Sequence, residues 1–187
     1  MLRMYGRRSL FMHVKAKTVA LGGLLLALTV VFMALGSIVE TSTLFLLAAA
    51  SFFVGIVVRE FGLKTGGAFY LAAVLLGAIT APNKFYVLTF AAMGLYIWGI
   101  EAVWRWLEKH PEMTQRYKFF WIAKYVIFNI VYIPIVILFR NLLFAQAVSA
   151  GMMTGVILGG QIGLFIYDRA YDYVQVHLWG KMRGRFL

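Results

Sequence analysis

Six long apolar segments joined by short polar links constrain this chain more than any other feature of its sequence. A helix needs about 20 mostly apolar residues to cross the hydrocarbon core of a bilayer. With 63% hydrophobic and 13% charged residues, the chain is far more apolar than a soluble domain. We therefore predict an all-α integral membrane bundle of six transmembrane helices that forms a single domain over residues 1–187. The predicted spans are Thr18–Val39, Thr41–Val58, Thr65–Ala81, Phe85–Trp106, Phe119–Phe139 and Gln146–Tyr167.

Lysine and arginine residues predict the orientation of these spans, because cytoplasmic loops retain them. Basic residues crowd the N-terminal segment (about 1–17), the links after the second and fourth spans, and the C-terminal tail. The opposite loops hold only Lys84 and Arg140. Both termini are therefore predicted to be cytoplasmic. The net charge of +11 is accounted for by this topology, so no nucleic-acid partner is expected.

The predicted outer face collects charged and amide side chains from its loops. Glu40 lies in the first outer turn, Asn83 and Lys84 lie in the second, and Arg140 and Asn141 lie in the third. Such groups are costly at membrane depth and mark candidate sites, and a bundle would bring these turns together at one mouth. The alternative is that they are interface anchors and turn formers, since a Pro-Asn pair forms a turn without any ligand.

The fifth span carries a polar stripe. Tyr125, Asn129 and Tyr132 fall on one helical face, and Pro134 follows them. The stripe either lines a cavity that opens outward, or Asn129 makes a hydrogen bond to a neighbouring helix, as amides often do in membranes. The candidate substrate-binding residues are Glu40, Asn83, Lys84, Asn129, Tyr132, Arg140 and Asn141.

Charged residues at the predicted cytoplasmic ends of the spans are expected to form structural ion pairs. Glu101 and Arg105 have helical spacing, and Lys124 is placed to reach Glu101. Gln161 is expected to form a hydrogen bond to a neighbouring helix. Further charges end the sixth span at Asp168, Arg169 and Asp172.

No catalytic set is apparent in the sequence. The histidines lie far apart and have no acidic partner at metal-binding spacing. There is no nucleophile motif and no phosphate-binding loop. Cysteine is absent, which excludes thiolate metal sites. Neither an enzyme nor a metal or other cofactor is expected.

Small residues follow one stripe of the first span, at Ala16, Ala20, Gly23 and Ala27. Small side chains let a second helix approach closely in a membrane. Because the stripe begins beside the basic N-terminal residues, it predicts a docking face for a partner at the cytoplasmic end.

Three stretches resemble substrate-binding S components of energy-coupling factor (ECF) transporters. They are "KTVALGGLLLALTVVFMALG", "GLKTGGAFYLAAVLLGAITAPNKFYVLTFAAMGLYIWGIE" and "GGQIGLFIYDRAYDYV". The resemblance implies six helices with both termini inside, in the plasma membrane of a prokaryote. It also implies a vitamin-like nutrient bound at the outer face, a transmembrane coupling protein as partner, and a pair of ABC ATPases that supply energy.

The family docks on its coupling protein through an Ala-x-x-x-Ala pattern in the first helix. By resemblance, Ala16, Ala20, Gly23 and Ala27 would form this contact, although Gly23 replaces an alanine and Leu24 interrupts the pattern. The expected function is capture of a small nutrient for import. The alternative is an accessory or scaffold subunit of a membrane complex that has no transport activity.

Overall fold

The computed structural model describes residues 2–139 and 149–186, and its regular elements are all helical. The prediction of an all-α protein is confirmed. The helices are α1 (Leu2–Ile38), the 3-10 turn η1 (Glu40–Ser42), α2 (Thr43–Phe61), α3 (Leu63–Thr80), α4 (Lys84–Glu108), α5 (Arg116–Leu138), α7 (Ala150–Tyr173), the π-helical stretch η2 (Val174–Trp179) and α8 (Gly180–Phe186).

Five helices in the described part of the chain are long and apolar enough to cross a membrane. They are the Val19–Ile38 part of α1 together with α2, α3, α4 and α5. Several membrane-spanning helices are thus present, whereas the sixth span, which corresponds to α7, stays a prediction. The basic segment before the first span does not form a separate element, because α1 begins at Leu2.

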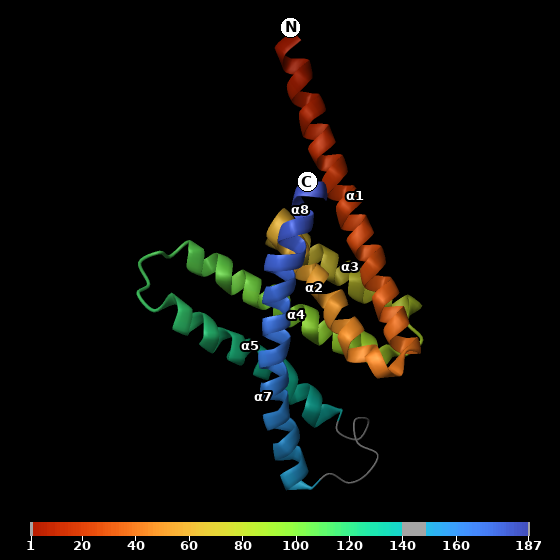
Figure 1. The fold of residues 1–187 in the computed structure, drawn as a ribbon, viewed down its shortest axis with the longest axis vertical. Helices are drawn as coiled ribbons and strands as arrows, with labels where there is room; N and C mark the ends of the chain where they lie inside the picture. Colours follow the sequence, from red (N-terminus) through yellow and green to blue (C-terminus); the bar gives the residue numbers. More distant parts are fainter. Residues whose placement is uncertain (1, 140–148, 187) are drawn as a thin grey trace.

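The helices are arranged around α2 and α4 (Figure 1). Helix α1 packs on α2 and α3, α5 packs along α4, and η2 contacts α2. In Figure 1, α7 crosses in front of α4, and its middle part contacts α5. The start of α1 and the end of α8 lie toward the same end of the molecule, at the top of the view. This placement is compatible with termini on one side of a membrane.

Helical spacing explains how α1 joins the bundle. Leu21, Leu25, Thr29 and Met33 repeat every fourth residue and are buried, so they form one face toward the core. The Thr29 hydroxyl donates to the Leu25 carbonyl at 2.8 Å, which satisfies the polar group on this face. On other faces of α1, Val19, Leu24 and Val31 are exposed.

A single glycine lets α2 and α3 pack closely. Gly62 has φ of +94°, a conformation that other residues rarely adopt, and it reverses the chain between α2 and α3 within one residue. Gly66 then lies directly against Val58, where a β-carbon would overlap with the valine. The tight turn brings the carboxyl end of α2 beside α4, where the charged residues of both helices meet.

Candidate functional site

The second outer turn uses its own polar atoms to build the start of α4. The Asn83 side chain accepts a hydrogen bond from the Phe85 amide at 2.9 Å, as a helix cap does. The Lys84 ammonium donates to the Ala81 carbonyl at 2.8 Å. Both side chains are exposed. In the structure, Asn83 and Lys84 thus make hydrogen bonds that stabilise the turn itself.

The other predicted outer residues are placed only in part. Glu40 begins the 3-10 turn η1, but its side chain lies outside the described residues. Arg140 and Asn141 also lie outside them. A shared mouth formed by the outer turns therefore stays a prediction.

The polar stripe of α5 joins α5 to α7. Asn129 and Gln161 exchange two amide hydrogen bonds, with N–O distances of 3.2 and 2.9 Å. The Tyr132 hydroxyl donates to the Val156 carbonyl at 2.8 Å, and the tyrosine ring lies over Gly160. Of the alternatives for Asn129, the hydrogen bond between helices is the one observed.

A buried ion pair links α5 to α7. The Lys124 ammonium lies 2.8 Å from the Asp168 carboxylate, and the two side chains are only 5% and 2% exposed. Tyr96 of α4 donates to the other carboxylate oxygen at 3.1 Å. The ammonium also lies 4.5 Å from the centre of the Phe120 ring. The prediction that Lys124 contacts Glu101 is wrong, because the lysine forms its ion pair with Asp168.

A further ion pair links α2 to α4. Arg59 contacts one oxygen of Glu101 at 2.6 and 2.7 Å, and Tyr171 of α7 donates to that same oxygen at 2.6 Å. The expected pair of Glu101 with Arg105 is also wrong. Arg105 instead donates to the Val58 carbonyl at the end of α2, which also accepts the Gly62 amide.

The inward face of α7 carries these contacts. Leu164, Asp168 and Tyr171 of α7, with Gln175 of η2, are buried at helical spacing, so a largely polar face lies against the other helices. Tyr167 beside this face forms a 2.7 Å hydrogen bond with Ser51 of α2. The sequence analysis missed the tyrosines and Ser51, although the spacing of polar residues along α7 was a signal for them.

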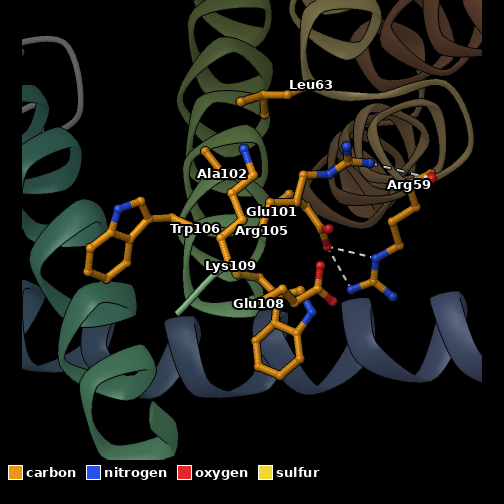
Figure 2. Close-up of a pocket in the computed structure, with 9 residues that line it drawn as sticks. Arg59, Leu63, Glu101, Ala102, Arg105, Trp106, Glu108 and Lys109 are labelled. Carbon is orange, nitrogen blue, oxygen red and sulfur yellow. Dashed lines mark hydrogen bonds and ion pairs between the residues drawn. The ribbon is translucent and has the colours of Figure 1, made fainter. Parts of the chain in front are cut away.

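Cavities lie beside the ion pairs, near the loops that carry the basic residues. The larger has a volume of about 1000 Å³, and Figure 2 shows Glu101 and Arg59 facing each other there. Trp106 points away from that pair in the same view. The smaller has a volume of about 230 Å³ and is bounded by side chains of α2, α4, α5 and α7 and by Tyr117 near the start of α5. These cavities lie on the predicted cytoplasmic side, not at the predicted outer mouth.

The small-residue stripe of α1 faces away from the bundle. Ala20, Gly23 and Ala27 are exposed, while the neighbouring Leu21 and Leu25 are buried. A β-carbon added at Gly23 would meet nothing within 4 Å. The side chain of Ala16 lies outside the described residues. Internal packing therefore does not use the described part of the stripe.

No protein-family model matches this chain, and no similar curated protein or solved structure is found. The candidate surfaces are therefore defined by their geometry alone.

Proposed function

We propose that the chain is the substrate-capture subunit of an ECF-type importer in a prokaryotic plasma membrane. In this proposal six helices span the bilayer, both termini are cytoplasmic, and a small vitamin-like nutrient binds at the outer face. A transmembrane coupling protein binds the subunit, and a pair of ABC ATPases powers import. The resemblance of the sequence and the several apolar helices support this function.

The observation that carries the proposal is the exposed stripe of α1. A bundle normally buries its small residues where helices approach each other closely. Here Ala20, Gly23 and Ala27 lie outside the core, although Leu21 beside them is inside it. An exposed smooth face suits a second membrane helix, which is what a coupling protein supplies.

The accessory or scaffold subunit is the second candidate. It is favoured by the contacts of Asn83 and Lys84, which serve their own turn and need no ligand. Mass spectrometry of the denatured, freshly purified protein separates the two. A small molecule that co-purifies in equal amount with the protein supports capture, and its consistent absence supports the scaffold.

Docking through α1 predicts that Ala20→Leu or Gly23→Leu weakens binding of the coupling protein. A leucine at either position holds the two helix backbones apart. Overpacking of this kind costs about 1–3 kcal/mol, which corresponds to roughly a fivefold to hundredfold loss of affinity. The measurement is the amount of coupling protein that co-purifies with the tagged subunit.

A matched control for this experiment is Gly159→Leu in α7. Gly159 is exposed, and an added β-carbon would meet nothing within 4 Å, so the leucine is equally tolerated by the subunit itself. This variant should bind the coupling protein normally. If Gly159→Leu blocks binding and Gly23→Leu does not, α1 is not the docking face.

The proposed orientation predicts that a cysteine at Asn83 is labelled by an impermeant thiol reagent added to intact cells. The chain contains no cysteine of its own, so the background is low. A cysteine at Glu112, in the link between α4 and α5, should be labelled only after the membrane is opened. The reverse pattern would invert the topology and move the capture site to the other face.

A further inference from the structure

The smaller cavity is lined by a carboxylate and a guanidinium that take no part in the ion pairs beside it. Lys124 is paired with Asp168, and Arg59 is paired with Glu101. Asp172 and Arg169 line the same cavity, and neither forms an ion pair with another described residue. The cavity therefore contains one carboxylate and one guanidinium that lie outside these ion pairs, and Lys124, Arg59 and Arg169 act on the Asp172 carboxylate electrostatically.

Asp172 is the less exposed of these two residues. It is half-buried and makes no hydrogen bond to the part of the chain that the structure describes. A carboxylate that loses water without gaining a donor is costly, so a ligand with a positive donor would stabilise it. Aromatic side chains of Trp104, Tyr117 and Trp121 line the cavity, and ring faces attract organic cations.

Arg169 supplies the opposite charge nearby. It lies three residues before Asp172 on α7, a spacing that places two side chains on neighbouring positions of one helix face. Its guanidinium is exposed and lies 5.4 Å from the centre of the Phe165 ring, so its donors remain open to an anion. Arginine binds phosphate through paired hydrogen bonds. An ammonium joined to a phosphate by a short linker matches both groups.

The cavity has the size and position of a headgroup site. Its 230 Å³ is below the usual volume of a pocket for a drug-sized molecule, so a headgroup fits where a larger ligand does not. The 67% exposed Tyr117 lies at the end of the span, where aromatic residues meet lipid headgroups.

We propose that this cavity binds the headgroup of a phospholipid that carries a primary ammonium, as phosphatidylethanolamine does. The ammonium donates to Asp172, and the phosphate accepts from Arg169. The site is independent of the proposed import function, because it lies on the side of the ion pairs and uses no residue of the outer turns or of the α1 stripe.

The test is native mass spectrometry of the full-length protein in micelles that contain equal amounts of phosphatidylethanolamine, phosphatidylcholine and phosphatidylglycerol. The wild type should retain phosphatidylethanolamine about tenfold better than the others, since only its headgroup donates N–H bonds to a carboxylate. Asp172→Asn should abolish this preference. Arg169→Gln should lower retention of all three lipids, because they share the phosphate.

The matched control is Glu112→Gln, which removes one exposed carboxylate from the link between α4 and α5 and should keep the preference. Equal retention of the three lipids by the wild type would overturn the proposal, as would an unchanged preference in Asp172→Asn. If Asp172→Asn does not fold, the wild-type comparison of phosphatidylethanolamine with phosphatidylcholine decides alone. If soluble phosphoethanolamine binds as tightly as phosphatidylethanolamine, the ligand of this cavity is a free phosphoethanolamine and not a lipid.

Discussion

Replacing Asp168 with asparagine is expected to lower the free energy of unfolding by about 3–5 kcal/mol, as the loss of one partner does for buried ion pairs. The Lys124 side chain is 5% exposed and would lose its ion-pair partner. Tyr96 can still donate to the asparagine oxygen, so the loss arises mainly from the lysine. Denaturant unfolding of the purified protein in detergent measures the change.

A second variant separates this electrostatic cause from simple disruption of packing. Adding Lys124→Met to Asp168→Asn removes the stranded charge and keeps an unbranched apolar side chain against Phe120. Replacing a whole buried pair in this way is often neutral. The double variant should therefore be more stable than Asp168→Asn alone. If it is less stable, the ion pair is not what limits stability at this position.

The sequence predicted the helices of the bundle well, because the length of an apolar run reports directly on a membrane-crossing helix. The third span was predicted at Thr65–Ala81, and α3 covers Leu63–Thr80. The early start of α1 could not be read from hydropathy. Its first turns are rich in arginine and lysine, which are good helix formers but poor markers of a span.

The charge pairing could not be predicted from spacing within one helix. Spacing identifies only local neighbours, and Glu101 and Arg105 are such neighbours on α4. The turn at Gly62 brings the Val58 carbonyl close enough for Arg105 to donate to it, and Arg59 then contacts Glu101. The contact of Lys124 with Asp168 depends in the same way on how α5 and α7 are rotated about their axes, which apolar composition does not specify.

Gly55→Ala is expected to destabilise the bundle by about 2–5 kcal/mol. The β-carbon would overlap with the Tyr171 ring, whose Cε2 and Cζ atoms lie 2.6 Å from its position. Tyr171 is fully buried and packs against Phe52 at 5.6 Å between ring centres, so moving the ring breaks this packing. Overpacking costs about 1–3 kcal/mol, and displacing the hydroxyl from Glu101 leaves buried polar atoms unpaired at a similar cost.

The control for Gly55→Ala is the same substitution at Gly155 in α7, where an added β-carbon meets nothing within 4 Å. There the helix should gain up to about 1 kcal/mol, since alanine restricts the unfolded chain more than glycine does. Tyr171→Phe is the second test, made alone and combined with Gly55→Ala. It removes the hydroxyl oxygen, which is the tyrosine atom nearest to the added carbon. The loss in the double variant should then be smaller than the sum of the two single losses, because both changes act on one contact. If the two losses of stability simply add, or if the Gly55 and Gly155 variants are equally stable, Gly55 is not needed for the contact between α2 and Tyr171 of α7.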